Sequence, residues 1–256
     1  MNVLGWNEFL QRKAILKDPI ALSIGVFDGV HRGHQTLIRK ITSYTEWKPW
    51  VITFHPNPSR IIRPGEYPGD IMTKRQKLRT FSDLELDTTV IIDFSWEFGK
   101  LRGTEFLSFI QNTVDVRFVA VGENFHCGYN MDTSAWRMKE LLEPKGIGVQ
   151  ILPSVRRGGE PISSTRIRNT ILEGNIFTAI DLLGHPFELD LEDLPVYTEE
   201  GRSLLERKAV PQVLPRRGTF SVEFRGPEGK RGGILEIEEE FLSWHSNGAI
   251  DAIVFT

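Results

Sequence analysis

The chain has 256 residues, 40% of them hydrophobic, and a formal net charge of −3 at pH 7. This size and composition suit a globular protein with a sizeable core in one or two domains, and the mild acidity gives no electrostatic case for binding nucleic acid or an anionic membrane. The single cysteine, Cys127, excludes an intrachain disulfide. With no signal peptide pattern and no apolar run long enough to cross a membrane, we expect a cytoplasmic protein.

Short apolar runs alternate with helical patterns through the first two-thirds of the chain, and these runs are rich in β-branched residues. They predict strands at residues 21–26, 50–54, 89–94, 117–122 and 148–152. Helices are expected after residue 34, at 73–84 (where Thr73 and Gln76 fit a capping box), at 104–112 and at 133–142. The alternation predicts an α/β domain with a mostly parallel sheet.

The segment between the first of these strands and the following helix is the most informative in the chain. Residues 25–34 contain three glycines and the pair His31 and His34. Glycine lets the backbone approach a ligand closely, and the amides that begin a helix favour an anion, to which two histidines can donate hydrogen bonds. The segment is neither a P-loop nor a dinucleotide fingerprint. Its position is nevertheless where open α/β sheets bind nucleotides.

A second group of polar residues surrounds the start of a later helical stretch. Residues 163–183 predict two helices that are broken at 173–175, and we expect Ser164 or Thr165 to cap the first one. Arg166 and Arg168 near that helix start oppose its macrodipole, which favours a bound phosphate there.

The last part of the chain differs in its sequence pattern, and a domain boundary is expected near residue 184. This predicts two domains, residues 1–184 and 185–256, the second small and β-rich. Its expected strands lie at 219–224, 233–237 and 249–255, with the first two forming a hairpin. A run of glutamates next to the second strand is interpreted as a solvated sheet edge: Glu236, Glu238, Glu239 and Glu240.

Four stretches, in this order, resemble one known family. Residues 25–34 (Gly-Val-Phe-Asp-Gly-Val-His-Arg-Gly-His) resemble the signature of the FAD synthetase (FMN adenylyltransferase) module of bacterial bifunctional riboflavin kinase/FAD synthetases, within the His-x-Gly-His nucleotidylyltransferases. Residues 53–58, 121–128 and 162–168 resemble further motifs of that module. The resemblance implies a Rossmann-like nucleotidylyltransferase domain that makes FAD and pyrophosphate from FMN and ATP, with Mg²⁺ accompanying ATP.

The resemblance also implies roles for particular residues. The catalytic residues would be His31, His34 and Arg168. The ATP-binding residues would be Gly25, Phe27, Asp28, Gly29, His31, Gly33, His34, Ser164, Thr165 and Arg168. The flavin-binding residues would be Phe54, Asn57, Asn124 and Phe125. No metal-ligating side chain is assigned, because phosphate oxygens and water would largely hold the Mg²⁺; Asp28 either touches it or only braces the turn.

The chain departs from the family pattern at three places. Asn57 stands where the family usually has histidine, and Cys127 replaces a common phenylalanine. Residues 213–222 only faintly resemble the riboflavin kinase barrel, whose Gly-x-Pro-Thr-Ala-Asn stretch is absent from the sequence, so kinase activity is not expected. ATP and FMN are the expected partners, without nucleic acid or membrane. Two alternatives stay open: transfer to another phosphorylated small molecule, and a catalytically silent relative that binds flavin or nucleotide.

Overall fold

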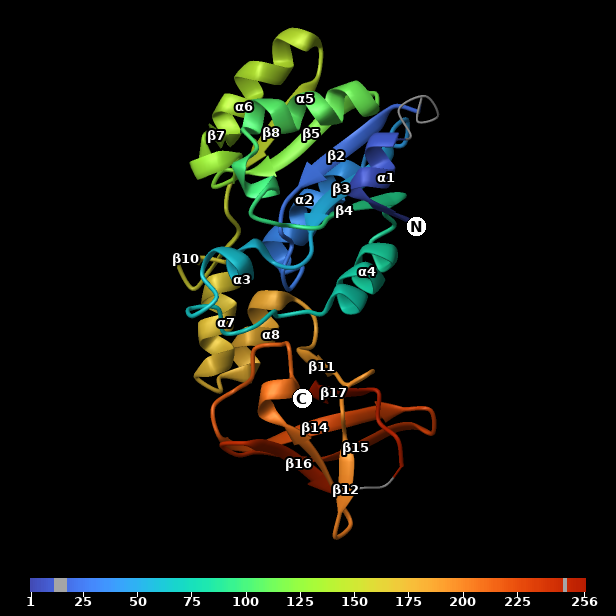
Figure 1. The fold of residues 1–256 in the computed structure, drawn as a ribbon, viewed down its shortest axis with the longest axis vertical. Coiled ribbons are helices and arrows are strands. Elements are labelled where there is room, and N and C mark those ends of the chain that lie inside the picture. Colours follow the sequence, from blue (N-terminus) through green and yellow to red (C-terminus); the bar gives the residue numbers. More distant parts are fainter. Residues whose placement is uncertain (12–17, 246–247) are drawn as a thin grey trace. The chain divides into compact units, whose positions relative to one another are not determined.

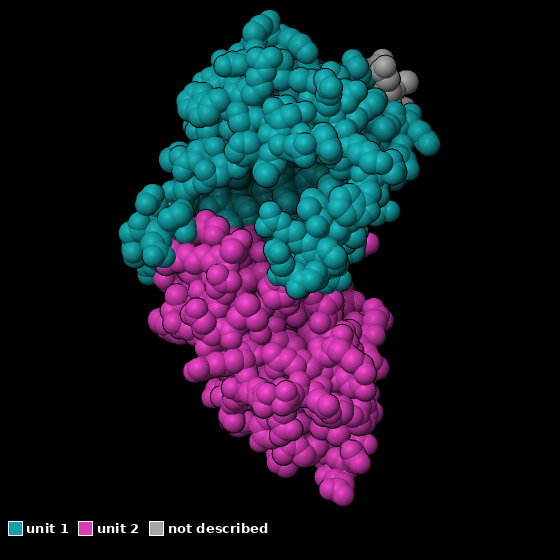
Figure 2. Space-filling model, turned by 60° about the vertical axis from the view of Figure 1, so that its left-hand side comes forward, with its two compact units in different colours: residues 1–67, 78–161 teal, residues 68–77, 162–256 magenta. Residues whose placement is uncertain are grey.

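The computed structural model describes residues 1–11, 18–245 and 248–256. These residues form two compact units: unit 1 contains residues 1–67 and 78–161, and unit 2 contains residues 68–77 and 162–256 (Figure 2). The functional boundary expected near residue 184 falls inside unit 2. Contacts show which segments pack together rather than which ones carry function, so that functional boundary stays a prediction.

Unit 1 is built on a six-stranded sheet in the order β1-β4-β3-β2-β5-β8, with every neighbouring pair parallel. Its strands are β1 (Asn2–Gly5), β2 (Ile20–Ile24), β3 (Lys48–Phe54), β4 (Thr88–Ile92), β5 (Val116–Gly122) and β8 (Gly148–Leu152). The five predicted strands and the parallel sheet are therefore confirmed. The edge strand β1 was not predicted, because three of its four residues are exposed and form no apolar run.

The helices of unit 1 fill the connections between these strands (Figure 1). They are α1 (Trp6–Gln11), α2 (Arg32–Thr42), α3 (Pro58–Ile62), α4 (Lys74–Asp83, begun in residues of unit 2), α5 (Gly103–Thr113) and α6 (Ala135–Leu142). The predicted capping box of α4 is confirmed: the backbone N–H of Thr73 donates to Gln76 Oε1 at 2.9 Å, and that of Gln76 donates to Thr73 Oγ1 at 3.2 Å. Helix α2 packs against β2, β3 and β5 through a face that buries Leu37, Ile38 and Ile41.

Short elements complete unit 1. They are the 3₁₀ turns η1 (Phe98–Lys100), η2 (Tyr129–Met131) and η3 (Glu143–Lys145), and the two-stranded pairs β6 (His126–Cys127) with β7 (Thr133–Ser134) and β9 (Arg156–Arg157) with β10 (Glu160–Pro161). The sheet order matters more for the site. Strand β2 lies between β3 and β5, so three neighbouring carboxyl ends meet at one edge where the strand order reverses, the usual ligand-binding edge of such sheets.

Unit 2 combines two helices with a seven-stranded antiparallel sheet. The helices α7 (Ser164–Leu172) and α8 (Ile176–Leu183) are broken where the sequence predicts. The sheet order is β11-β17-β14-β15-β16-β13-β12. Its strands are β11 (Glu188–Asp190), β12 (Tyr197–Glu199), β13 (Arg202–Glu206), β14 (Gly218–Gly226), β15 (Gly229–Ile237), β16 (Phe241–His245) and β17 (Ala252–Phe255), with η4 (Arg207–Ala209) before β14. The small β-rich part and its β14–β15 hairpin are confirmed.

Two local predictions in unit 2 are wrong. Ser163, rather than Ser164 or Thr165, caps α7, because its Oγ accepts the backbone N–H of Arg166 at 3.2 Å. The glutamate run does not mark a sheet edge: Glu236 lies on β15 between two paired strands, beside Ser243 and ion-paired with Arg202, and the run after it turns into β16. Separately, none of the helices in the described parts of the chain is long and apolar enough to cross a membrane.

Candidate active site

The loop that follows β2 has an unusual backbone. Phe27, Gly29 and Val30 have φ angles of 51°, 78° and 35°. Positive φ is costly for residues with a Cβ and gathers at ligand-binding sites, where surrounding contacts hold it. Two such contacts are present: Gln35 Nε2 donates to the carbonyl of Val30, and Thr53 Oγ1 donates to that of Val26, both at 3.0 Å. The loop is thus held by both α2 and β3.

His31 and His34 form a stacked pair at the start of α2. Their ring centroids are 3.6 Å apart with an interplanar angle of 18°. His31 is buried and caps the helix, since its Nδ1 accepts the backbone N–H of His34 at 3.4 Å. Because Nδ1 is the acceptor, the neutral His31 ring carries its proton on Nε2. A Cβ on Gly33 would lie 3.2 Å from the His31 ring, so glycine leaves room for this pair.

The remaining predicted ATP-binding residues of the loop support the imidazole pair. The buried ring of Phe27 meets His34 edge-on with centroids 5.1 Å apart and also packs against Phe81. A Cβ on Gly25 would come within 3.2 Å of the Phe27 ring. Asp28 is buried as well. The side chain of Phe27 therefore braces His34.

Two of the predicted flavin-side residues follow β3. Phe54, the last residue of β3, is half-buried and forms an aromatic cluster with Phe94 and Phe98, at centroid distances of 6.0 and 6.2 Å. Asn57 is buried, and its Oδ1 accepts the backbone N–H of Ser59 at 3.1 Å, which caps the short helix α3. The structure thus gives Asn57 a capping role beside the flavin role expected for it.

The other two follow β5, in a loop tied to the segment after β8. Asn124 is exposed, and its Nδ2 donates to Ser154 Oγ at 3.2 Å, while Phe125 packs partly buried against the core. Glu123 Oε1 accepts the backbone N–H of Ser154 at 3.0 Å, and the hydrogen bonds from Ser154 lower the pKa of the Glu123 carboxyl. The loop that carries Asn124 is therefore held by hydrogen bonds to Ser154, in the segment after β8.

Cys127 lies just beyond this loop, on β6. Burial raises the pKa of its thiol to about 12, and the charge of Asp132 acts in the same direction. The thiol therefore stays protonated at neutral pH. Cys127 is a small, packed side chain, as the sequence indicates, rather than a nucleophile.

The second predicted group lies in unit 2, in the first turns of α7. Ser164 and Arg168 are half-buried and Thr165 is exposed. Arg168 Nε donates to the backbone carbonyl of Gly69 at 3.1 Å. Gly69 is itself buried with a φ of 123°, in the region that favours glycine. The Arg168 guanidinium is thus hydrogen-bonded to a backbone carbonyl 99 residues earlier in the chain.

These residues fall into two groups in the structure. His31, Asn57 and Asn124 follow β2, β3 and β5 and share one edge of the unit 1 sheet. Ser164, Thr165 and Arg168 share the start of α7 in unit 2. Sequence reasoning missed the braces Gln35, Glu123 and Gly69. No sequence signal distinguishes them, since the first lies in an ordinary helical pattern and the other two in polar turns.

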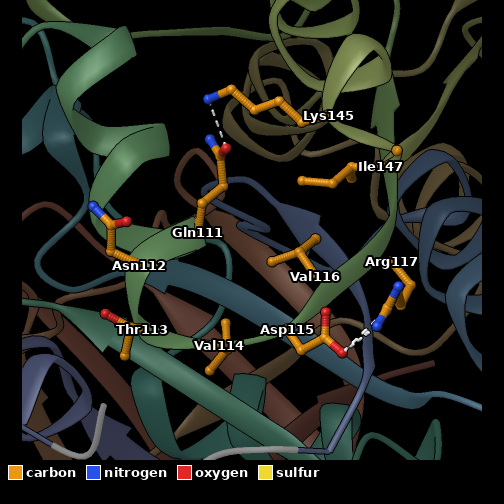
Figure 3. Close-up of a pocket in the computed structure, with 10 residues that line it drawn as sticks. Gln111, Asn112, Thr113, Val114, Asp115, Val116, Arg117, Lys145 and Ile147 are labelled. Atoms are coloured by element: carbon orange, nitrogen blue, oxygen red, sulfur yellow. Dashed lines mark hydrogen bonds and ion pairs between the residues drawn. The ribbon is translucent and has the colours of Figure 1, made fainter.

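An open hollow of about 530 Å³ lies at the other end of the unit 1 sheet, where β5 begins (Figure 3). Its charged lining is internally paired: Lys145 Nζ donates to Gln111 Oε1 at 2.8 Å, and Arg117 pairs with Asp115 at 2.8 Å. The predicted site follows the opposite ends of the strands, so this hollow is separate from it. Over the described ranges, no cluster of three or more His, Cys, Asp or Glu side chains is placed to hold a metal ion.

Comparison with known proteins agrees with this geometry. Residues 14–166 match the family model for FAD synthetase. A bifunctional riboflavin kinase/FMN adenylyltransferase of Escherichia coli K12 is 29% identical over 214 residues, which is 80% of this chain and 68% of that protein. An FAD synthetase of Listeria monocytogenes is 30% identical over 169 residues, 65% of this chain and 69% of that protein.

A solved structure shows the same fold over the whole chain. It is a crystal structure of a macrolide-efflux protein from Streptococcus pneumoniae, with a TM-score of 0.83 and 23% identity, covering 100% of this chain and 89% of that one. At this identity the likeness concerns the fold alone. The family model, in contrast, spans the His31–His34 loop, the Asn124 loop and the start of α7. The chain belongs to the FAD synthetase family.

Proposed function

We propose that this protein is an FMN adenylyltransferase. A phosphate oxygen of FMN attacks the α-phosphorus of ATP in line, a new P–O bond forms, and the bond from the α-phosphorus to the bridging β-phosphate oxygen breaks, which gives FAD and pyrophosphate. FMN supplies an anionic nucleophile, so catalysis consists of positioning and charge stabilisation. The observation that carries this proposal is the stacked His31–His34 pair at the start of α2.

His31 and His34 would bind the triphosphate of ATP. The capping bond to Nδ1 fixes the His31 ring with Nε2 as its donor, and Gly33 and Phe27 hold the two rings in place. Donors fixed in advance stabilise the charge that develops on the transferred phosphoryl group without reorganising during the reaction. The backbone of Gly25, Asp28 and Gly29 would line the same phosphates.

Arg168, with Ser164 and Thr165, would hold the β- and γ-phosphates. A guanidinium suits this task because its planar fork can bind two phosphate oxygens at once. Mg²⁺ would enter with ATP, coordinated mainly by phosphate oxygens and water, and would offset the triphosphate charge. Phe54, Asn57, Asn124 and Phe125 would contact FMN.

The proposal keeps residues 1–184 as the adenylyl-transferring part and residues 185–256 as a β-rich part without kinase activity. Phosphorylating riboflavin requires a base to orient its hydroxyl and a metal near the γ-phosphate, which the family draws from the Pro-Thr-Ala-Asn stretch missing here. ATP and FMN are the proposed partners, without nucleic acid. A single cysteine supports a cytoplasmic setting, and a net charge of −3 gives no electrostatic case for nucleic-acid binding.

The test is an incubation of the purified protein with FMN, ATP and Mg²⁺, followed by chromatographic assay of FAD and enzymatic assay of pyrophosphate. We expect both products in equal amounts. Parallel incubations replace FMN with riboflavin, which we expect to give no FMN, or with other phosphorylated acceptors. Transfer to another acceptor alone would point to a different nucleotidylyltransferase, and binding of FMN or ATP without turnover would point to a silent relative.

A further inference from the structure

Gln212 is a buried polar residue between η4 and β14, with 2% of its surface exposed. Its Oε1 accepts the backbone N–H of Asp190 at 2.8 Å. Its Nε2 donates to the carbonyls of Ile71 and Glu188, at 3.0 and 2.8 Å, and to Gln76 Oε1 at 3.2 Å. A buried amide engaged on both of its polar atoms fixes the segments it joins, because losing it leaves buried partners short of a hydrogen bond.

The segment held by Gln212 begins at Gly69. The backbone N–H of Asp70 donates to the carbonyl of Pro211 at 3.1 Å, and that of Val213 donates to the carbonyl of Asp70 at 2.8 Å. A Cβ on Gly69 would lie 2.6 Å from the backbone nitrogen of Val213. The two backbones therefore approach at a distance that only glycine allows, and residues 69–71 are fixed on residues 211–213.

Helix α7 is hydrogen-bonded to the Gly69 segment and to a residue shortly after the stretch 211–213. Gly69 presents its carbonyl to Arg168 Nε at 3.1 Å. At the other end of that helix, the carbonyl of Leu172 accepts the backbone N–H of Arg216 at 3.1 Å. The helix that carries Arg168 is therefore tied to the Gly69 segment that Gln212 holds, and its last residue is tied to Arg216, four positions after Gln212.

We propose that Gln212 is a positioning residue for Arg168. It fixes residues 69–71, and the carbonyl of Gly69 then orients the guanidinium toward the ATP phosphates; the inference rests on the proposed function for its catalytic consequence. The β-rich part of the chain then has a function of its own, since its residue Gln212 keeps the phosphate-binding side chain of Arg168 in the active orientation.

A double-mutant cycle tests this proposal. Gln212→Met has similar length and no hydrogen bonds, and we expect it to raise the KM for ATP about tenfold, the usual size of coupling between connected residues, with little change in the KM for FMN. In an Arg168→Ala background the same substitution should have no further effect on the KM for ATP. Glu236→Gln, which breaks an ion pair elsewhere in unit 2, is the matched control and should leave both constants unchanged.

A second readout does not depend on activity. The Nε–H resonance of Arg168, assigned by its loss in Arg168→Lys, should exchange with solvent faster in Gln212→Met than in the wild type. Thr73→Val is a variant of nearly the same shape that removes the hydrogen bond to Asp190 Oδ2 at 2.6 Å together with the cap that Thr73 Oγ1 gives to α4, and it should move both readouts in the same direction by less. If Gln212→Met fails to fold, the same two measurements on Thr73→Val test the proposal.

Two results would overturn the proposal: additive effects of Gln212→Met and Arg168→Ala on the KM for ATP, or unchanged exchange of the Arg168 Nε–H in a folded variant. Failure of the wild type to make FAD would reject the proposed function instead. The exchange measurement would still show whether Gln212 orients Arg168.

Discussion

The two parts of the candidate site are held in opposite ways. The His31 loop of unit 1 is fixed mostly by near neighbours in the chain: His31 caps its own helix, and Gln35 reaches back five residues to Val30. Arg168 Nε of unit 2 donates to the carbonyl of Gly69, 99 residues earlier, and the Gly69 segment is held in turn at Ile71, whose carbonyl accepts from Gln212, 141 residues later. The first part should therefore depend less on distant segments than the second does.

The largest expected effect is on the local part of the site. His31→Ala should lower kcat by about 10²–10³-fold, the usual loss when one preorganised donor is removed. It should also cost about 1 kcal/mol of stability, because a helix cap is lost. His31→Asn separates the two effects, since asparagine caps helices well but lacks the imidazole. We expect it to keep the melting temperature and lose the turnover; near-normal turnover in both variants would place the chemistry elsewhere.

The next effect concerns the distant part. Gly69→Ala should lower the free energy of unfolding by about 2–3 kcal/mol, because its Cβ would meet the backbone of Gln212 and Val213 at a positive φ. Gly232→Ala is the matched control, since nothing lies within 4 Å of a Cβ built there. Denaturant unfolding of both variants, with hydrogen exchange followed in β14 and β15, checks this. Equal stability of the two variants would show that residues 69–71 are loosely held.

A smaller effect is expected from Arg168→Lys. It keeps the charge but loses the planar fork and the Nε that donates to Gly69, so the KM for ATP should rise about tenfold while the KM for FMN stays unchanged. Arg166→Lys on the same helix is the control and should change neither constant by more than about twofold. Steady-state kinetics with each substrate varied in turn measures this. A larger rise in the KM for ATP in Arg166→Lys than in Arg168→Lys would mean that Arg166, rather than Arg168, binds the phosphates.

The smallest effect concerns Cys127. Its thiol has a pKa of about 12, so it should be alkylated by iodoacetamide far more slowly at pH 8 than a free thiol. Burial disfavours the charged thiolate, so the rate should rise as the pH approaches 12. Mass spectrometry of the native protein against a small thiol measures this ratio. Equal rates at pH 8 would mean that the β6–β7 region opens readily.

Sequence patterns predict the local features of this protein well. The five central strands, the Thr73–Gln76 capping box and the break between α7 and α8 each depend on neighbouring residues, and each is confirmed. The same holds for the position of His31 in the loop between a strand and a helix, at the edge where the carboxyl ends of parallel strands align.

The features that escape prediction depend on distant or competing partners. Three consecutive residues, Ser163 to Thr165, can each cap a helix, and in the structure Ser163 is the capping residue. The glutamate run looks like a sheet edge in the sequence, but β16 pairs beside Glu236. Nothing local in the run Pro-Gly-Asp at residues 68–70 shows that it lies against residues 211–213, because that contact joins segments about 140 residues apart in the chain.

The membership of residues 68–77 in unit 2 has a consequence for synthesis on the ribosome. At roughly 5–20 residues per second, Gln212 is made roughly 7–28 s after Ile71. Unit 1 can close its parallel sheet in that interval, but the carbonyl of Ile71 lacks its Gln212 partner until the β-rich part emerges. The nascent chain therefore acquires its histidine pair well before Arg168 takes its final orientation.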